Sequence, residues 1–557
     1  MRKQYDVIVV GTGAGGSTAI KALCEAGLNV VALNSGRPIN PAKDFSGHIR
    51  DFELPFRGLG DPKVSKSWVT CETERTTDKN IWEHDIGYTK AEDTEWVWSR
   101  CKAVGGKANF WGRSSARFSE MDFRAAREDG ADIEWPISYQ EIAPYYDRVE
   151  RYIGVASTVQ NRPSNPDGIY LRPIPFRAHD QILQKSAKEI GVPYLPDRVA
   201  QLTQSHNDHP PCHYCGRCGS GCDTGSFFSP SWFTLPDAEL TGNLELRTNA
   251  HVREVLVGKD ERFARGVAYV DRDTGEEIEV EGKAIILAAS CCETAKIMLN
   301  STSSQWPNGI ANSSGQVGRN ISDHLYGISV NGFLPQLIGK ESRPDNVHDS
   351  TVAWMPRWQN LNGRDHDEFI RGYSMYPYGG CDSFPWWSDY IGGFGSSFKK
   401  NIRRFYGAPV NFLIQAPSLP STSNYMDIDP DKKDLFGIPL ARFHFSWGEN
   451  ELAMWEHSKL ICSEIVENAG GEIWEVGGEP SPPGSSLHET GTCRFGYDPE
   501  TSVTNSFSQT HDVLNLFVCD ASIFPFATDK TSTLGIMAFS LRTADHIHSR
   551  FKDGSIA

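Results

Sequence analysis

Four cysteines lie within eleven residues of one another, in the order Cys212, Cys215, Cys218 and Cys222. This C-x2-C-x2-C-x3-C spacing is typical of loops that hold an iron–sulfur cluster through thiolate sulfur, and it predicts electron transfer one electron at a time. Zinc also binds four thiolates, although usually from two separated pairs, so zinc, a disulfide or idle thiols stay open as alternatives. Because Cys222 precedes Asp223 rather than proline and no second run follows, [3Fe-4S] and [4Fe-4S] clusters both stay open.

The composition limits the classes of protein that this chain can belong to. The 557 residues exceed what one hydrophobic core normally organises, so we expect more than one domain. The formal charge of −16 disfavours nucleic acid as a partner and favours a neutral substrate. No apolar run reaches the length of a transmembrane helix, and the chain begins with a strand rather than a leader. Thirteen cysteines are an odd number, and cluster assembly needs reduced thiols, so we expect folding in a reducing cytoplasm.

The N-terminus predicts a strand, a glycine-rich turn and a helix. An apolar, β-branched run over residues 5–10 is followed by Gly11, Gly13 and Gly16, which match G-x-G-x-x-G, and then by a helical stretch. A second strand over residues 29–33 completes a βαβ unit. In such a unit the first glycine forms the turn, the second admits a pyrophosphate and the third allows close packing of the helix. The motif predicts a dinucleotide site, and by itself it does not separate FAD from NAD.

The acidic residue that usually ends the second strand of this unit is replaced by Asn34. Its amide can still hydrogen-bond a ribose hydroxyl. Far downstream, strands are predicted over residues 244–257 and 264–270, with a turn at 273–275. A buried strand over residues 284–289 then runs into a helix. These segments return the chain to the same dinucleotide-binding sheet.

Four segments, in this order, resemble the glucose–methanol–choline (GMC) family of flavin oxidoreductases. Besides the N-terminal unit they are Ala103 to Gly112, Val317 to His324, and a C-terminal pair that runs from Leu487 to Gly496 and from Leu516 to Met537. The resemblance implies an α/β fold in which an α+β substrate domain is inserted into a Rossmann-like FAD-binding domain. The implied FAD-binding domain comprises residues 1–125, 235–325 and 485–557, and the substrate domain comprises residues 126–234 and 326–484, with the cysteine loop at 206–228.

The resemblance also implies FAD as the cofactor and gives roles to particular residues. His488 corresponds to the active-site histidine above the flavin ring, and Thr531 stands near the usual second catalytic residue, which is Asn or His. A threonine hydroxyl can orient a substrate oxygen, but it cannot act as a base near neutral pH. The cofactor-binding residues implied by the glycine motif and the family segments are Gly11, Gly13, Gly16, Asn34, Gly105, Gly106, Asn109, Trp111, Gly112, Val252, Asp520, Thr533 and Leu534.

Oxidation of an alcohol needs a hydride acceptor at carbon, which flavin N5 would supply, and a proton acceptor at oxygen, which His488 would supply. The cysteine run resembles the dehydrogenases of the family, such as glucoside 3-dehydrogenase, FAD-dependent glucose dehydrogenase and gluconate dehydrogenase. This resemblance implies a sugar or glycoside substrate, with C3 of a glucoside favoured, and a haem c electron acceptor. It also implies a small companion subunit, which often carries the signal for export to the periplasm.

Other functions stay open. One is an oxygen-using sugar oxidase of the same family with a structural metal. Another is a flavin-containing lyase or deglycosylation component, because Thr531 replaces a usual catalytic residue. A third is an electron-transfer scaffold with little activity of its own. Aromatic residues are dense between Trp354 and Tyr406; we expect most of them to pack in a core, although such rings also suit the C–H faces of a sugar.

Overall fold

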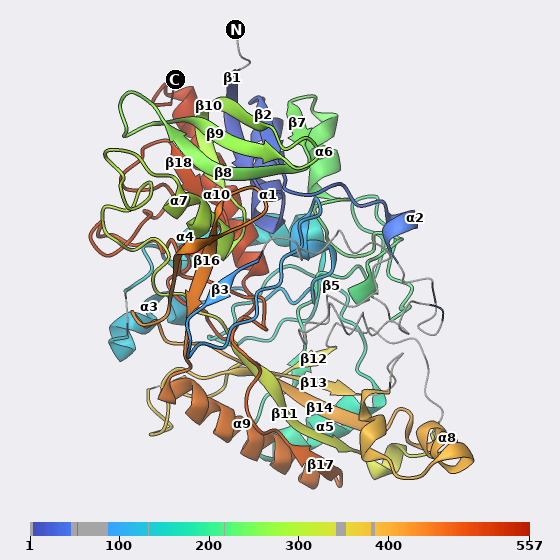
Figure 1. Ribbon diagram of the computed structural model, residues 1–557. Coiled ribbons are helices and arrows are strands. Elements are labelled where there is room, and N and C mark those ends of the chain that lie inside the picture. The colour runs from blue at the N-terminus through green and yellow to red at the C-terminus, as the bar shows by residue number, and fades with distance from the viewer. Residues whose placement is uncertain are drawn as a thin grey trace.

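The computed structural model describes residues 4–45, 49, 53, 87–131, 133–216, 218–340, 352–361, 363–379 and 385–556. Two sheets lie toward opposite ends of the molecule (Figure 1). The first has the strand order β7-β2-β1-β10-β9-β8, with β18 also paired to β10. Its strands are β1 (Gln4–Val10), β2 (Val30–Leu33), β7 (Leu244–Arg247), β8 (Ala250–Val257), β9 (Ala264–Asp271), β10 (Glu277–Leu287) and β18 (Leu516–Val518).

The glycine-rich turn forms as the sequence predicts, between β1 and helix α1 (Ala14–Glu25). Gly11 has a φ of +97°, which favours glycine, and a Cβ there would lie 2.3 Å from the carbonyl oxygen of Ala288. A Cβ on Gly15 would lie 1.9 Å from the carbonyl oxygen of Cys519. Glycines therefore let α1 start directly against the strand ends of the sheet.

The centre of the first sheet is parallel and apolar. β1 pairs in parallel with β2 and β10, and β10 pairs in parallel with β18. The predicted strand over residues 244–257 is divided at Asn249, which has a φ of +55°. As a result β7 pairs in parallel with β2, whereas β8 pairs antiparallel with β9. The helices α1, α6 (Thr234–Leu240), α7 (Cys291–Asn300) and α10 (Thr533–Lys552) accompany this sheet, and α1 packs on α10.

The second sheet has the order β13-β14-β11-β17 and is covered on its outer side by helix α9 (Figure 1). Its apolar face forms a separate core with α9 and α5. The bounds of these elements are β11 (Leu325–Phe333), β13 (Ser374–Gly379), β14 (Pro409–Ala416), β17 (Glu472–Val476), α5 (Ala178–Glu189) and α9 (Glu449–Asn468).

Smaller elements complete the described part of the chain. The remaining strands are β3 (Thr89–Lys90), β4 (Val155–Ala156), β5 (Tyr170–Leu171), β6 (Leu195–Pro196), β12 (Ala353–Trp354), β15 (Tyr425–Lys433) and β16 (Pro439–His444). The remaining helices are α2 (Pro41–Asp44), α3 (Glu120–Asp129), α4 (Tyr139–Ile153) and α8 (Gly395–Phe405). Within the described ranges, no helix is both long and apolar enough to cross a bilayer.

The α/β architecture with two sheets agrees with the predicted fold class. The predicted domain boundaries stay a prediction. Of the aromatic residues that crowd the sequence after residue 353, Trp354 and Trp387 are fully buried, as expected for packing. Phe394 is 89% exposed instead, and Trp386 lines the cavity described below.

Candidate active site

A cavity of about 890 Å3 extends from the glycine-rich turn of the first sheet to the inner face of the second sheet. At one end it is lined by Gly11 and Gly13, and at the other by Tyr376 on β13 and Leu413 on β14. His488 lines the cavity as well. The cavity therefore joins the predicted dinucleotide site, the predicted base and the substrate side of the fold.

The nucleotide end has the shape that a pyrophosphate requires. A Cβ on Gly13 would meet no atom within 4 Å, so this position opens onto space. A Cβ on Gly16 would lie 2.1 Å from the carbonyl oxygen of Gly11 and is excluded by the turn itself. Gly13 thus fits close approach of a cofactor, and Gly16 fits tight folding of the turn, which are the two roles predicted for them.

The residues predicted around the adenosine differ in how available they are. Val252 and Asn34 both line the cavity. The Asn34 amide is nevertheless engaged, since Oδ1 accepts from Thr12 Oγ1 at 2.8 Å and Nδ2 donates to the carbonyls of Gly36 and Lys102 at 3.0 and 2.9 Å. Asn34 therefore ties three loops together around the cavity and retains only acceptor capacity for a ribose hydroxyl.

Some residues of the segment 103–112 line the cavity, and others lie behind them and hold them in place. Gly106, Trp111 and Gly112 line the cavity. Asn109 is fully buried instead, and its Nδ2 donates to the carbonyl of Val104 at 2.9 Å, which holds the short 3-10 turn η5 (Gly106–Asn109). Gly105, with a φ of +90°, starts this turn beside Asn109. These two residues position the wall without forming it.

Two of the three cofactor-binding residues predicted in the C-terminal segment line the cavity. Asp520 and Thr533 line the cavity, whereas Leu534 is fully buried in the core under α10. The Asp520 carboxylate accepts from Thr294 Oγ1 at 2.5 Å and from the backbone N–H of Ser522 at 2.9 Å. Burial raises the pKa of Asp520 against these hydrogen bonds.

His488 is paired with a second histidine that the sequence interpretation did not single out. The Nδ1 atoms of His488 and His324 lie 2.9 Å apart. The other nitrogen of His324, Nε2, lies 2.6 Å from the carbonyl oxygen of Thr528. Because a carbonyl can only accept, His324 Nε2 carries a hydrogen, and the neutral ring then has its lone pair on Nδ1. His488 must donate from Nδ1, which leaves the lone pair of His488 on Nε2.

The surroundings keep both rings neutral. Burial lowers the pKa of His324 to about 4. Burial, together with His324 and the cation of Lys107, holds the pKa of His488 well below its ordinary value of 6.5. A neutral imidazole with an unprotonated Nε2 can accept a proton, so the tautomer set by His324 is the one that a general base needs.

The backbone around His488 is held by Asp323, the residue before His324. Asp323 is buried, and its carboxylate accepts from the N–H of Gly484 at 2.8 Å and from the N–H of His488 at 3.2 Å. Ser486 also donates its hydroxyl to Asp323. Burial and the nearby Glu489 raise the pKa of Asp323 to about 7. The segment from Asp323 to His324 therefore fixes both the backbone and the ring of His488.

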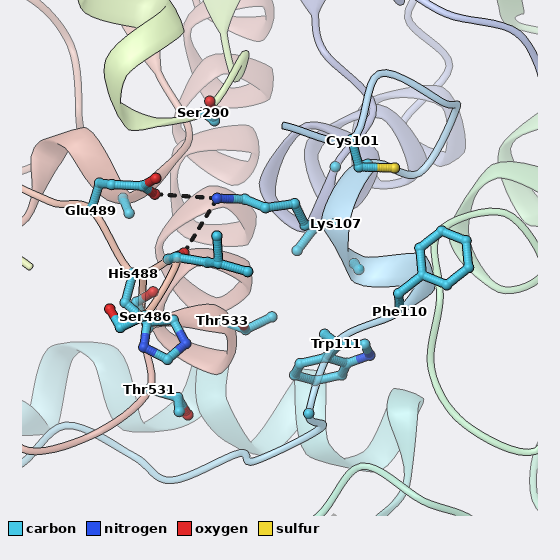
Figure 2. Close-up of a pocket in the computed structure, with 18 of the residues that line it drawn as sticks. Cys101, Lys107, Phe110, Trp111, Ser290, Ser486, His488, Glu489, Thr531 and Thr533 are labelled. Carbon is cyan, nitrogen blue, oxygen red and sulfur yellow. Dashed lines mark hydrogen bonds and ion pairs between the residues drawn. The ribbon is translucent and has the colours of Figure 1, made fainter. Parts of the chain in front are cut away.

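A partly buried ion pair lies beside this histidine (Figure 2). Lys107 Nζ lies 3.2 Å from Glu489 Oε2 and donates to the carbonyl of Leu487 at 3.3 Å. Burial lowers the pKa of Lys107, but Glu489 outweighs that effect and raises it. Lys107 thus brings a fixed positive charge to the cavity wall and holds the chain on both sides of His488.

Thr531 lines the cavity near His488 (Figure 2). Its hydroxyl donates to the carbonyl of Ser114 at 2.9 Å. The Oγ1 atom can still accept a hydrogen bond, but its proton is used by the backbone. The direct hydrogen-bond partner of His488 is His324, so the position that the family fills with Asn or His does not supply that contact here.

The cysteine loop lies next to the cavity. Gly219, between the third and fourth cysteines, lines it. A Cβ on Gly221 would lie 2.2 Å from the ring of Phe45, and that ring packs edge-on against Phe110, which also lines the cavity. The loop is therefore packed through Phe45 against the segment that carries Trp111.

The four cysteines of this loop differ in exposure. Cys218 is buried, Cys215 is exposed, and Cys212 and Cys222 are intermediate. The Cys212 sulfur accepts from the N–H of Tyr214 at 3.2 Å, and the Cys222 sulfur accepts from the N–H of Ser226 at 3.3 Å. Backbone N–H groups directed at sulfur stabilise thiolate ligands.

The sulfurs do not enclose a metal in this arrangement. Across the part of the chain that the structure describes, which omits Arg217 within the loop, no group of three or more His, Cys, Asp or Glu side chains is placed to hold a metal ion. Burial raises the pKa of Cys212, and so do the neighbouring Cys222 and Cys215. The predicted iron–sulfur site therefore stays a prediction.

Comparison with known proteins identifies the family of this chain. Two family models, both described as GMC oxidoreductase, match residues 5–326 and 420–540. Among solved structures, pyridoxine 4-oxidase from Mesorbium loti has the same fold, with a TM-score of 0.63 and 16% identity over 98% of this chain and 99% of that one. Formate oxidase from Aspergillus oryzae RIB40 gives a TM-score of 0.63 at 14% identity over 99% of both chains.

Curated relatives match over nearly the whole chain. 2-Methyl-1,2-propanediol dehydrogenase from Mycolicibacterium austroafricanum is 29% identical, and the match covers 99% of this chain and 96% of that protein. The gluconate 2-dehydrogenase flavoprotein of Pantoea cypripedii is 27% identical over 99% of this chain and 94% of its own. The fructose dehydrogenase large subunit of Gluconobacter japonicus is 26% identical, and the match covers 99% of this chain and 98% of that subunit. The chain belongs to the GMC oxidoreductase family and is an FAD-dependent oxidoreductase that acts on CH–OH groups.

Proposed function

We propose that this protein is a dehydrogenase that oxidises a secondary hydroxyl of a sugar or glycoside to a ketone, with C3 of a glucoside as the favoured position. We propose further that the electrons leave through an iron–sulfur cluster to a haem c partner. The observation that carries the first proposal is the hydrogen bond from His488 to the buried His324. It leaves an unprotonated Nε2 at a cavity that is also lined by aromatic and amide side chains.

The chain's own residues provide for removal of the hydroxyl proton. His488 Nε2 accepts that proton, and His488 Nδ1 stays hydrogen-bonded to His324, so the ring keeps its orientation as it becomes charged. Thr531 can accept a second hydrogen bond from the substrate, because its own proton is donated to Ser114. When bound, FAD supplies the acceptor for the hydride that leaves the carbon.

The cofactor would be held by residues on three sides. Gly11 and Gly13 would face the pyrophosphate, and Val252 the adenine. Trp111 and the Lys107–Glu489 pair would line the redox end, since both belong to the cavity wall beside His488. The fixed cation of Lys107 favours negative charge that develops near it during the reaction.

The names of the relatives support a dehydrogenase of hydroxylated compounds. Gluconate and fructose are sugar-type substrates, and 2-methyl-1,2-propanediol is a small diol. Paromamine 6'-oxidase from Streptomyces fradiae, at 25% identity, keeps an oxidase as the second candidate. The cysteine loop beside the cavity favours the dehydrogenase, because an oxidase needs no exit for single electrons.

The first test is an anaerobic titration of the purified protein with a panel of glycosides, followed by flavin absorbance. We expect bleaching by sugar substrates, turnover with an artificial dye and no turnover-linked peroxide. Hydrogen peroxide formed at the rate of turnover would refute the dehydrogenase. Unchanged flavin absorbance on adding a converted substrate would instead support the lyase alternative. The His488→Ala variant is expected to retain FAD and to lose substrate-driven bleaching.

A second test addresses the four cysteines. Iron content and the EPR signal are measured in protein prepared without air, for the natural protein, for Cys222→Ala and for Cys24→Ala as a matched control outside the loop. We expect Cys222→Ala to lower iron content and dye-linked turnover while flavin bleaching persists, and we expect Cys24→Ala to keep its iron. Iron-free natural protein would contradict the cluster.

The partner and compartment follow from the same proposal. The names of two relatives, a flavoprotein and a large subunit, support a small companion subunit here. We propose that the chain folds in the cytoplasm and reaches the periplasm by export with that companion. Co-purification of a haem c protein and a signal-bearing small subunit would test this.

A further inference from the structure

Strand β14 crosses the middle of the second sheet and is buried along its whole length (Figure 1). Its sequence alternates between two faces. Val410, Phe412, Ile414 and Ala416 pack into the apolar core under α9 and α5. The opposite face presents Asn411, Leu413 and Gln415 to the cavity. Two amides therefore occupy a strand that packing alone would make apolar on both faces.

One polar atom of each amide lacks a hydrogen-bond partner within the described part of the chain. Asn411 Oδ1 and Gln415 Nε2 are buried, and neither makes a hydrogen bond there. Asn411 is 9% exposed and Gln415 is 2% exposed. A buried amide without a hydrogen bond destabilises a protein unless a ligand completes it. Both amides line the cavity, so a bound molecule can supply the missing partners.

The two amides face different parts of the cavity. Gln415 pairs across the sheet with Tyr326, which is two residues beyond His324, so this end of β14 lies at the catalytic pair. Asn411 pairs with Tyr378 on β13, away from that end. Asn411 and Gln415 are four positions apart on the strand, so their Cα atoms are separated by about 13 Å. This span exceeds a single pyranose ring.

We infer that the cavity binds a polyhydroxylated substrate of two units, with Gln415 hydrogen-bonding the ring that is oxidised and Asn411 hydrogen-bonding a second hydroxylated unit. The inference rests on the proposed function and narrows it to disaccharides and similar glycosides. Tyr326, Tyr376 and Tyr378 lie beside the amides on β11 and β13 and line the same cavity. Their rings suit the C–H faces of two sugar units, and the amides suit the hydroxyls.

The test compares Asn411→Leu, Gln415→Met and Asn331→Leu by anaerobic flavin reduction. The substrates are maltose, cellobiose, lactose and trehalose, set against methyl α-glucoside, methyl β-glucoside and cyclohexanol. Asn331 lies on β11 opposite Asn411, but it is outside the cavity and donates to Glu475 Oε2 at 3.3 Å, so it serves as the control.

We expect the natural protein to prefer at least one disaccharide over the methyl glucosides. Asn411→Leu should lower kcat/KM for that disaccharide by roughly tenfold to hundredfold and leave the methyl glucosides unchanged. Gln415→Met should lower kcat/KM for both sugar classes and spare cyclohexanol. Asn331→Leu should change none of these ratios.

Thermal unfolding separates recognition from a structural role. Replacing an unpartnered buried amide by an apolar side chain is neutral or stabilising, so Asn411→Leu should keep or raise Tm and keep its FAD. A lower Tm with unchanged substrate ratios, or a natural protein that does not distinguish disaccharides from methyl glucosides, would overturn the inference. If no sugar bleaches the flavin at all, the proposed function fails instead.

Discussion

The most direct test of the site is the replacement of His324 by phenylalanine. The ring keeps its approximate size, but it loses both nitrogen atoms. Two buried groups then lose their partners, namely Nδ1–H of His488 and the carbonyl of Thr528. The unpaired N–H costs about 1–3 kcal/mol, which corresponds to roughly 5- to 150-fold in the population of the productive tautomer. The loss of rate cannot exceed the whole contribution of a general base, which is about 10²–10⁴.

The assay is stopped-flow flavin reduction without oxygen, with the reduction rate and the substrate Kd fitted separately. We expect His324→Phe to slow reduction by at least about tenfold while FAD content and substrate Kd stay near those of the natural protein. His324→Asn should recover part of the rate, because an amide oxygen can accept from His488 Nδ1–H. A structural role alone would not produce this recovery.

His457→Phe is the matched control. Tyr373 and His457 Nδ1 form a hydrogen bond of 2.6 Å, and burial lowers the pKa of His457 to about 4, as for His324. His457 does not line the cavity. Its replacement should lower stability without slowing flavin reduction. Flavin reduction by His324→Phe at the natural rate, or an equal slowing in His457→Phe, would contradict the role assigned to His324.

Three further outcomes are expected. Gly13→Ala should fold with unchanged secondary structure yet bind FAD weakly, because its Cβ meets no protein atom but faces the cofactor side, and apoprotein circular dichroism with FAD titration measures both. Thr531→Ala should slow flavin reduction less than tenfold and lower the unfolding free energy by about 1 kcal/mol, as measured by urea denaturation. His324 stays neutral in the folded state down to about pH 4, whereas the unfolded ring binds a proton below 6.5. The natural protein should therefore lose up to about 3 kcal/mol more unfolding free energy than His324→Phe between pH 6.5 and 4, and an equal loss in both would contradict this assignment.

Local patterns were sufficient for the nucleotide half of the fold. The elements of the β1–α1–β2 unit follow one another closely in the sequence. Gly11 and Gly16 of its turn are required by close contacts with backbone oxygens, whereas Gly13 opens onto space. The division of residues 244–257 into β7 and β8 depends on the φ of a single asparagine, and periodicity does not register such a break. Gly105, Asn109 and Leu534 lie one layer behind the cavity wall, a distinction that sequence position does not contain.

The catalytic pair was harder to predict because its members are 164 residues apart. His324 belongs to a segment that carries the family resemblance, and the Asp323–His324 pair in that segment was the available signal. The place of Thr531 in the C-terminal segment predicts a contact with the substrate. In the structure its hydroxyl donates a hydrogen bond to the carbonyl of Ser114. The amides of β14 had a clearer signal, since Asn411 and Gln415 interrupt an apolar strand at a spacing that puts both on one face.

The pairing of β10 with β1 and β18 bears on how the chain is made. Ile285 lies in register with Leu516 on one side and Ile8 on the other, so neighbouring strands come from the beginning, middle and end of the chain. During synthesis the β1–α1–β2 unit precedes β18, so the sheet cannot be completed until residues 516–518 have left the ribosome. A nascent chain that stalls before residue 516 therefore lacks both β18, which pairs with β10, and Asp520 of the cavity wall.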